Sequence, residues 1–525
     1  MNMQQNNNTN WASPLKYSVI LILGIFLGIF LKGKLSFSWW GSDKTVPVQE
    51  IIDLVRTKYV DKITNDSAEQ KFVDYYLSQL DPHSVYIPPA ALTEVNEQLM
   101  SNYKGIGIEF QMIRDSVFVS NVIKDGPAFK AGLKIGDILL FADDTIQLSG
   151  KRMDSEVIRT KLRSANTNQL KLVLLSGSKR VTVSMNRENV PVAAVDASYQ
   201  IKPGVGYIHI DKFSDRTYEA FMQALEPLVK DSIKTLVIDL RGNGGGLLSE
   251  AVAIADELIP GNKLLVYTQG DNSPRTEYVS KREGLFEKGQ VIVWLDESSA
   301  SASEVLAGAL QDWDRATIVG RSSFGKGLVQ QQFKLSNGGA LRLTVARYYT
   351  PLGRNIQRPF NKGKEAYVDD FVNRVHDNAM GKQDSLVKGK MYKTPNGKKV
   401  YGGGGIYPDM WVSSANLFLD SSYKPLLKNG LLMDFILHYY LSAQNKINAL
   451  GNTAAFINAY KNVDLLAALV QFGGPSNKLD MASLEKNRQF IQRFILLELA
   501  RKQWYKQGYY EAQNMLDSGF LSSLP

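Results

Sequence analysis

The sequence predicts a mixed protein of the α/β (α+β) class. Two short apolar runs, Leu236–Leu240 and Val291–Leu295, have strand composition, and each is followed by a glycine- or serine-rich turn and then by a helical stretch. A module of short predicted strands precedes them at about Tyr103–Asn189, and the composition from about Lys424 onward is helical. The 525 residues are enough for two or three domains with a sizeable core.

Ser301 stands at the start of a predicted helix, Ser301–Trp313, directly after the second apolar run and its turn. The first four N–H groups of a helix have no partner within the helix, and the helix dipole favours negative charge there. A tetrahedral oxyanion formed on Ser301 would therefore be stabilised where it forms, which makes this residue a candidate nucleophile. The residue pattern alone leaves four serines open, Ser298, Ser299, Ser301 and Ser303.

A serine hydroxyl needs a neighbouring base, which is usually a histidine. Each of the four histidines has an ordinary structural explanation in a turn, a strand, a polar stretch or a helix: His83, His209, His376 and His438. Lys326 is the better candidate, because the glycines and apolar side chains of 324–329 can desolvate its amine. Desolvation lowers the pKa of a lysine from about 10.4 toward roughly 7 to 8, where the neutral amine can accept a proton. Gln330 can orient the amine without adding charge.

A glycine loop, Arg241-Gly242-Asn243-Gly244-Gly245-Gly246, follows the first apolar run. It does not match a nucleotide site, because Leu247 stands where the last glycine of G-x-G-x-x-G would be, and no Gly-Lys-Ser/Thr follows. Glycines also let backbone amides approach a reacting carbonyl, as an oxyanion hole requires.

The run Ser299-Ala300-Ser301-Ala302-Ser303-Glu304, together with Phe324-Gly325-Lys326-Gly327 and Gln330, resembles the carboxyl-terminal processing (tail-specific) proteases, serine peptidases of family S41. That resemblance implies a Ser-Lys dyad, with Ser301 as nucleophile, Lys326 as general base and Gln330 as the residue that positions the lysine. It also implies that the amides of Gly246 and Ala302 form the oxyanion hole, with Gly245 left open as an alternative to Gly246. No metal or cofactor is implied.

The sequence around Asp125-Gly126-Pro127-Ala128 and Gly136-Asp137 resembles a PDZ domain. Such domains add an extended peptide to a sheet edge and receive its terminal carboxylate in a loop of backbone amides. The corresponding loop here contains Lys104, Gly105, Ile106, Gly107 and Ile108. A purely structural role for its glycines, in permitting a tight strand entry, stays open.

The resemblance extends over about residues 70–410 and implies a crotonase/ClpP-like peptidase core with an inserted PDZ domain, an N-terminal membrane anchor and a helical C-terminal extension. The expected domains are an N-terminal tail with a transmembrane signal anchor at about 15–35 (1–45), a helical N-terminal region (46–100), the PDZ domain (101–190), the serine peptidase core (191–412) and the helical C-terminal extension (413–525).

The anchor is expected from the uncharged run Tyr17–Leu31, which is 15 residues long. Apolar residues on both sides could extend it to the roughly 20 that a bilayer requires. One lysine precedes the run and three follow it closely, so the positive-inside rule favours a cytoplasmic body. The family places its catalytic part outside the cytoplasm. We therefore expect a single pass through the inner (cytoplasmic) membrane with the catalytic part in the periplasm.

Composition excludes several kinds of site. The chain has no cysteine, so disulfides, a thiol nucleophile and thiolate zinc sites are excluded. The net charge of +9 is interpreted as a solvated basic surface and not as a nucleic-acid site, because no basic run is interleaved with aromatic residues. The expected partners are protein or peptide substrates bound by their C-terminal tails, the membrane, and an adaptor or activator protein.

Two other function classes stay open at this point. A non-catalytic PDZ scaffold predicts that replacing Ser301 or Lys326 leaves function intact. A serine hydrolase that pairs Ser301 with His209 predicts that His209→Ala abolishes activity and that Lys326→Ala does not. An acyl-coenzyme A enzyme is disfavoured, because its chemistry has no use for a PDZ module.

Overall fold

The computed structural model describes residues 48–58, 67–97, 100–150, 153–163, 168–379, 389–413, 430–474, 479 and 481–525. The chain divides into two units, residues 1–70 and 71–525. Of the first unit the structure describes helix α2 (Val48–Lys58) and the beginning of α3 (Ser67–Ser78). The expected anchor at 15–35 lies outside the described residues, and within them no helix has the length and apolar character to cross a membrane.

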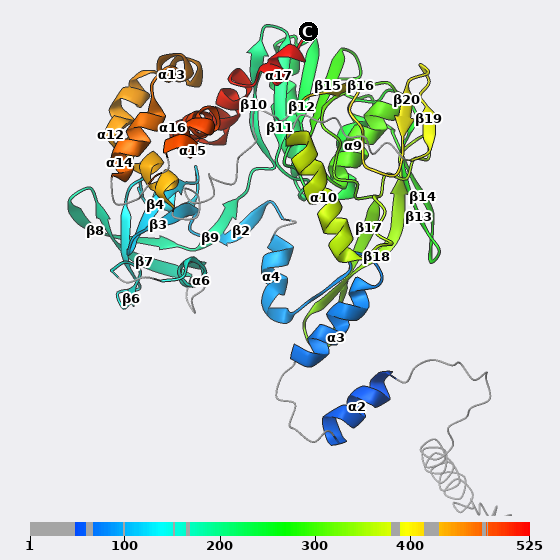
Figure 1. The fold of residues 1–525 in the computed structure, drawn as a ribbon, viewed down its shortest axis with the longest axis horizontal. Coiled ribbons are helices and arrows are strands. Elements are labelled where there is room, and N and C mark those ends of the chain that lie inside the picture. The colour runs from blue at the N-terminus through cyan, green and yellow to red at the C-terminus, as the bar shows by residue number, and fades with distance from the viewer. Residues whose placement is uncertain are drawn as a thin grey trace, which may run out of the picture. The chain divides into compact units, whose positions relative to one another are not determined.

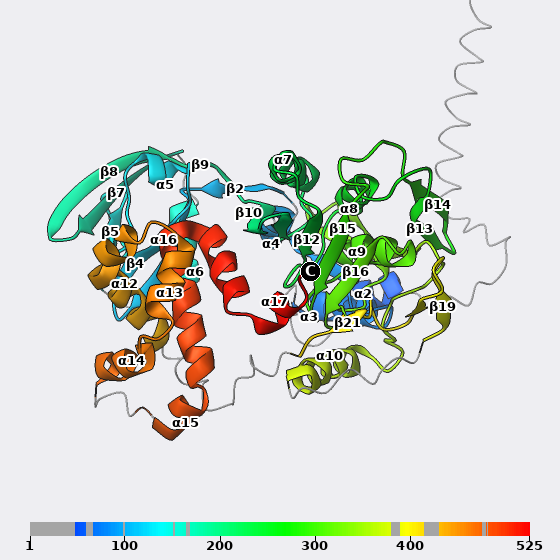
Figure 2. The ribbon, with the colours of Figure 1, turned by 90° about the horizontal axis from the view of Figure 1, so that it is seen from above.

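The expected peptidase core is built around a six-stranded sheet with the order β10-β11-β12-β15-β16-β21 (Figure 1 and Figure 2). Its first pair is antiparallel, and the remaining pairs are parallel. The strands are β10 (Val195–Lys202), β11 (Val205–Ile210), β12 (Thr235–Asp239), β15 (Gln290–Leu295), β16 (Ala316–Gly320) and β21 (Met410–Trp411). Helices α7 (Thr217–Lys230), α8 (Leu248–Asp256) and α9 (Ala302–Asp312) follow β11, β12 and β15 along the chain.

Both faces of this sheet are covered, which explains the uninterrupted apolar runs Leu236–Ile238 and Val291–Leu295 in its central strands. Side chains alternate between the two faces of a strand. On β12, Leu236 and Ile238 join the core formed with α7, α8 and α9. Val237 faces the other side, where it packs in a cluster with Trp294 and with Phe520 of the C-terminal extension.

A second sheet, which is antiparallel, carries the loop that contains Lys326, called the lysine loop below. Its strands are β1 (Val85–Ile87), β13 (Leu264–Gly270), β14 (Ser273–Val279), β17 (Leu328–Lys334) and β18 (Ala340–Tyr349). The sequence predicts only helices between residues 46 and 100, and this is wrong for β1. Three residues pair there with the edge of β18, a partner far away in the sequence. Helix α10 (Lys364–Ala379) and the hairpin of β19 (Met391–Lys393) and β20 (Lys399–Tyr401) complete the core.

The strand module ahead of the core forms one six-stranded antiparallel sheet with its own apolar core. Its strands are β3 (Ile108–Ile113), β4 (Ser116–Val122), β5 (Ile138–Ala142), β6 (Ile146–Gln147), β7 (Gln169–Ser176) and β8 (Lys179–Asn186), and its helices are α5 (Pro127–Lys130) and α6 (Ser155–Arg163). A short ribbon of β2 (Asn102–Gly105) and β9 (Glu188–Pro191) joins the module to the core, and α4 (Pro89–Glu97) precedes it. Among the described strands β3 pairs only with β4, so no described strand occupies its outer edge.

The C-terminal extension is a helical bundle with a separate core cluster. Its helices are α12 (Leu431–Ala449), α13 (Thr453–Tyr460), α14 (Leu465–Gly473), α15 (Met481–Lys486), α16 (Arg488–Met515) and α17 (Ser518–Ser522). Helix α16 contributes to this cluster through Ile491 and Leu497, which are buried in it. Helix α16 is kinked at Trp504 and Tyr505, where the backbone leaves helical geometry.

The kink lets α16 contact two parts of the chain (Figure 2). Before it, Arg501 pairs with Glu109 of β3 at 2.5 Å. After it, Lys506 pairs at 2.8 Å with Asp196 of β10 in the peptidase core. The extension therefore contacts both the strand module and the core.

Candidate active site

Ser301 is the N-cap of α9 and has unusual backbone angles, φ 54° and ψ −110°. A non-glycine residue with positive φ is strained, and such strain is concentrated at functional sites. The conformation is fixed from both sides of the residue. Its N–H donates to Oε2 of Glu304 at 2.8 Å, and its carbonyl accepts from the hydroxyl of Tyr348 at 3.1 Å.

The glycine loop after β12 lies against Ser301 through Gly245. A Cβ added to Gly245 would lie 2.8 Å from the Cβ of Ser301 and 2.9 Å from the amide nitrogen of Ala302. Asn243 holds the loop in place, because its carbonyl accepts from the amide of Ala300 at 3.0 Å and from Oγ of Ser303 at 3.0 Å. The glycine loop and the turn that contains Ala300 and Ser301, called the nucleophile turn below, thus form one hydrogen-bonded unit.

The amides of this unit differ in their availability. The N–H of Gly245 donates to Oδ1 of Asn243 at 2.8 Å, so it is already occupied. Within the described part of the chain, the N–H groups of Gly246 and Ala302 have no hydrogen-bond partner. The amides of Gly246 and of Ala302, the residue after Ser301, are therefore free to donate to a ligand, whereas the amide of Gly245 is not.

Lys326 lies in the loop before β17. Its Nζ donates to Oε1 of Gln330 at 3.2 Å, and Nε2 of Gln330 donates to the carbonyl of His83 at 2.7 Å. Burial lowers the pKa of Lys326, and the charge of Arg342 lowers it further, while Glu304 and Asp81 act in the opposite direction. The described residues form no hydrogen bond between Nζ of Lys326 and Oγ of Ser301. Catalytic hydrogen bonds are often long in the absence of substrate.

Two residues tie the lysine loop to the nucleophile turn. Oε2 of Glu304 accepts from the backbone N–H of Lys326 at 2.8 Å, in addition to that of Ser301. The carbonyls of Ser301 and Lys326 both lie within hydrogen-bond distance of the hydroxyl of Tyr348 and share its single proton. Sequence reasoning missed both roles. The signal for Glu304 is the Ser-x-x-Glu spacing of a helix capping box, which brings the N3 carboxylate back to the N-cap amide.

The turn Asp81-Pro82-His83-Ser84 is a further part of the site. The sequence predicts only a turn for His83 and no role in the site. Oδ1 of Asp81 accepts from the amides of His83 and Ser84 at 2.8 and 2.9 Å, which fixes the His83 carbonyl that Gln330 binds. Burial, followed by the charge of Lys326, lowers the pKa of His83 to about 4. The imidazole is therefore neutral near pH 7.

His209 is engaged elsewhere. Its Nδ1 lies 2.6 Å from Oδ1 of Asp196, its Nε2 lies 3.4 Å from the carbonyl of Arg241, and its ring stacks on Tyr510. Burial disfavours the protonated ring, but the Asp196 carboxylate outweighs that effect and raises the pKa of His209. Both ring nitrogens face structural partners, so the geometry does not favour the Ser-His arrangement.

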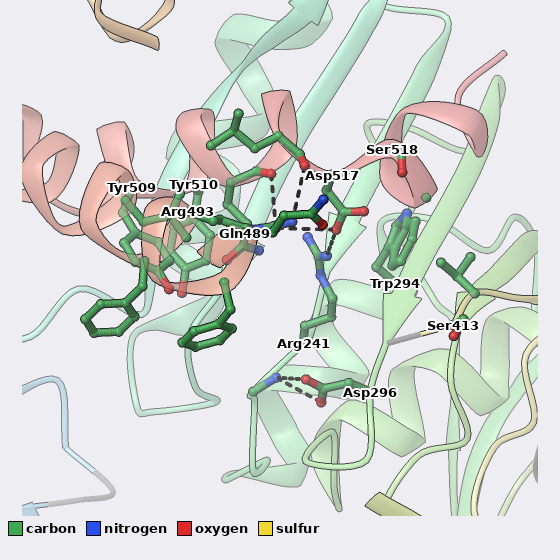
Figure 3. Close-up of a pocket in the computed structure, with 18 of the residues that line it drawn as sticks. Arg241, Trp294, Asp296, Ser413, Gln489, Arg493, Tyr509, Tyr510, Asp517 and Ser518 are labelled. Carbon is green, nitrogen blue, oxygen red and sulfur yellow. Dashed lines mark hydrogen bonds and ion pairs between the residues drawn. The ribbon is translucent and has the colours of Figure 1, made fainter. Parts of the chain in front are cut away.

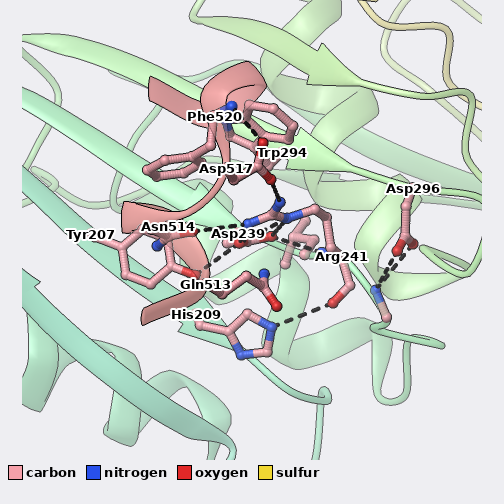
Figure 4. Close-up of polar contacts among 12 residues, drawn as sticks. Tyr207, His209, Asp239, Arg241, Trp294, Asp296, Gln513, Asn514, Asp517 and Phe520 are labelled. Carbon is pink, nitrogen blue, oxygen red and sulfur yellow. Dashed lines mark hydrogen bonds and ion pairs between the residues drawn. The ribbon is translucent and has the colours of Figure 1, made fainter. Parts of the chain in front are cut away.

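Arg241, the first residue of the glycine loop, is held by the C-terminal extension (Figure 4). Its guanidinium pairs with Asp239 of β12 at 2.5 Å and with Asp517 at 3.1 Å, and it donates to Oδ1 of Asn514 at 3.1 Å. The same group lines a cleft of about 980 Å³ between the core and the extension, next to Trp294 (Figure 3). The sequence gives no local signal for these contacts.

The expected carboxylate-binding loop connects β2 to the open-edged strand β3. The amides of Ile106 and Gly107 have no hydrogen-bond partner in the described residues, and Gly107 has φ 77°. Gly105 and Ile108 flank them at the ends of the two strands. Nζ of Lys104 donates to Oδ1 of Asn168 at 2.8 Å.

Comparison with known proteins gives two family matches, to peptidase family S41 over residues 204–365 and to the PDZ domain over residues 104–186. The carboxy-terminal-processing protease of Bartonella bacilliformis is 32% identical over 312 residues, which cover 59% of this chain and 71% of the relative. The chain belongs to the carboxy-terminal processing proteases of family S41. It is a serine-type peptidase with a PDZ domain, and its substrates are proteins or peptides.

Two further proteins are similar to this S41 peptidase. The carboxy-terminal processing protease CtpB of Bacillus subtilis is 32% identical over 316 residues, covering 59% of this chain and 65% of the relative. A solved structure, the photosystem II D1 C-terminal processing protease, is 25% identical with a TM-score of 0.39, covering 71% of this chain and 88% of that one.

Proposed function

We propose that this S41 peptidase cleaves peptide bonds by a Ser-Lys dyad, with Ser301 as nucleophile, Lys326 as general base and Gln330 as the residue that orients the lysine. The observation that carries the proposal is the shared use of Glu304 by the amides of Ser301 and Lys326. One buried carboxylate thereby holds the nucleophile and the base in a fixed relation. The lowered pKa of Lys326 supplies a neutral amine more readily than an exposed lysine would.

The reaction follows from these positions. Oγ of Ser301 attacks the scissile carbonyl while Nζ of Lys326 takes its proton, and the oxyanion is bound by the free amides of Gly246 and Ala302. Lys326 then returns the proton to the leaving amine, and water attacks the acyl-enzyme to release the second product. Gln330 keeps Nζ aligned through both steps, because it is itself fixed on the carbonyl of His83.

Recognition of the substrate tail is assigned to the PDZ domain. The open edge of β3 suits the addition of an extended peptide, and the free amides of Ile106 and Gly107 at its start suit a terminal carboxylate. In this proposal Lys104 supplies additional positive charge near the loop, and Gly105 and Ile108 complete it. The module then delivers the adjoining chain to Ser301.

Membrane anchoring through about residues 15–35, with the catalytic part in the periplasm, is also part of the proposal. Its support is the uncharged apolar run Tyr17–Leu31. Attachment to a membrane would restrict the enzyme to substrates that are exported to its surface. An adaptor or activator protein remains a proposed additional partner.

The test uses full-length protein in detergent and an unfolded substrate protein with an apolar C-terminus. Wild type should degrade it, and Ser301→Ala and Lys326→Arg should not. Arginine keeps the positive charge of Lys326 but cannot be deprotonated, so it isolates the role of the base. Wild-type rates in Lys326→Arg would reject the dyad.

Tail recognition has a separate test. The same substrate with an amidated C-terminus should be cleaved with a higher KM, because the tail carboxylate is missing.

A further inference from the structure

Arg342 lies on β18 on the sheet face that Lys326 occupies. In the register of β17 and β18, Gln330 is opposite Thr344 and Gln332 is opposite Arg342. Opposite residues share a face, and residues two apart on a strand share it too. Because Gln330 accepts from Nζ of Lys326, the Arg342 side chain lies on the same face as that amine.

The Arg342 guanidinium has little bonding within the protein. It carries five N–H donors, of which one bonds to Oε1 of Gln332 at 3.1 Å. It forms no ion pair with any described residue. Three buried arginines of the core differ in this respect, because each has a carboxylate partner within 2.7 Å: Arg321 with Glu297, Arg354 with Asp312 and Arg358 with Asp370.

Leaving a half-buried cation unpaired is unfavourable, and no described carboxylate compensates for it. Burial alone accounts for the lowered pKa of Arg342. A second polar group on this face is also unused, since the buried Oγ1 of Thr344, opposite Gln330, has no hydrogen-bond partner. None of the Arg342 nitrogens is a buried atom without a partner, so its free N–H groups are accessible to a ligand.

We propose that Arg342 is a specificity-determining residue that binds a carboxylate of the substrate; this rests on the proposed roles of Ser301 and Lys326. The planar guanidinium can hold a carboxylate through two parallel N–H···O bonds. The carboxylate comes either from an acidic side chain near the scissile bond or from a chain terminus. In both cases Arg342 also offsets the field that this anion would exert on Lys326.

The experiment measures kcat/KM on paired peptides that carry Glu or Gln at one position, scanned through the residues on both sides of the scissile bond. The enzymes are full-length wild type, Arg342→Gln, Arg342→Lys and the control Arg347→Gln. Arg347 lies on the same strand but is exposed. Each peptide is made with a free and with an amidated C-terminus.

Wild type and Arg347→Gln should prefer Glu over Gln at one position by about 10- to 100-fold, the worth of a charge-assisted hydrogen bond. Arg342→Gln should reduce that ratio to about 1, and Arg342→Lys should keep part of it. A general loss of folding or of base strength lowers both members of a pair and leaves the ratio unchanged. If amidation, and not Glu→Gln, produces the Arg342-dependent difference, the carboxylate is that of the chain terminus.

The proposal is overturned if Arg342→Gln keeps the wild-type ratio both for the Glu and Gln peptides and for the free and amidated peptides. Failure of the proposed dyad would be visible separately. In that case Lys326→Arg would cleave all peptides at wild-type rates, whatever the Arg342 variants do.

Discussion

The backbone N–H of Lys326 donates a hydrogen bond of 2.8 Å to Oε2 of Glu304. That carboxylate also accepts from the N–H of Ser301 and, through Oε1, from Oγ of Ser323 and the N–H of Gly325. Four donors from two separate segments thus meet at one buried side chain. The relative position of the proposed nucleophile and base therefore depends on Glu304.

Glu304→Gln should lower kcat/KM by about 100-fold, the usual consequence of displacing reacting groups by about 1 Å. The new NH₂ group would face N–H donors that it cannot accept from, so the free energy of unfolding should also fall by about 2 kcal/mol. Peptide hydrolysis and urea unfolding measure the two effects. Glu226→Gln, on the exposed side of α7, is the matched control and should be neutral in both.

The lowered pKa of Lys326 predicts a pH dependence of activity. Because the neutral amine is the base, kcat/KM should rise with pH through an inflection below 10.5, the ordinary value for lysine. An inflection at or above 10.5 in the rate profile would contradict a desolvated base.

The free energy of unfolding should also depend on the titration of Lys326. The unfolded chain binds the Lys326 proton more tightly than the folded one, so the free energy of unfolding rises with pH between the folded and the unfolded pKa. Below the folded pKa the cost of burying the ammonium is complete. Lys326→Met should therefore be more stable than wild type at pH 7 and show a smaller alkaline rise, whereas Lys334→Met, exposed on β17, should show neither change.

Substitution by alanine should have different effects at the neighbouring residues Gly244 and Gly245 of the glycine loop. A methyl group on Gly245 would lie 2.5 Å from the carbonyl oxygen of Ala300 and 2.8 Å from the Cβ of Ser301, and the residue has φ 94°. Gly245→Ala should reduce kcat/KM by at least about 100-fold. Gly244→Ala meets open space without positive φ and should retain near wild-type activity, so equal behaviour of the two variants would argue against the loop's contact with Ser301.

The C-terminal extension should influence the glycine loop through Asp517. Asp517→Asn removes the charge that pairs with Arg241 at 3.1 Å, at the start of that loop. Coupling of this kind is worth about 1 kcal/mol, so kcat should fall about 5-fold with little change in KM. Asp231→Asn, exposed after α7, is the control. A loss in Asp517→Asn that appears only in KM would indicate an effect on substrate binding instead.

Local patterns in the sequence pointed to much of the candidate site, because a nucleophile turn, a glycine loop and a lysine turn each have their own residue pattern. Lys326 could be named in this way, whereas the choice of Ser301 among four serines and of Gly246 over Gly245 came from the resemblance to family S41. The assignment of their roles stays a prediction. The contact of Gln330 with His83 spans 247 positions along the chain, so no window of sequence contains it. The ion pair of Asp517 with Arg241 could not be predicted for the same reason, because the sequence around Asp517 does not indicate which residue it contacts.

The most direct test of the central claim is the labelling of full-length protein with a fluorophosphonate, which phosphonylates an activated serine Oγ as fluoride leaves. Peptide mapping by mass spectrometry locates the adduct, and the labelling rate is compared in wild type, Lys326→Arg and His209→Gln. A Ser-Lys dyad predicts one adduct on Ser301 in wild type, a rate reduced by at least about 100-fold in Lys326→Arg, and a near wild-type rate in His209→Gln. An adduct on another serine, or equal rates in wild type and Lys326→Arg, would contradict it.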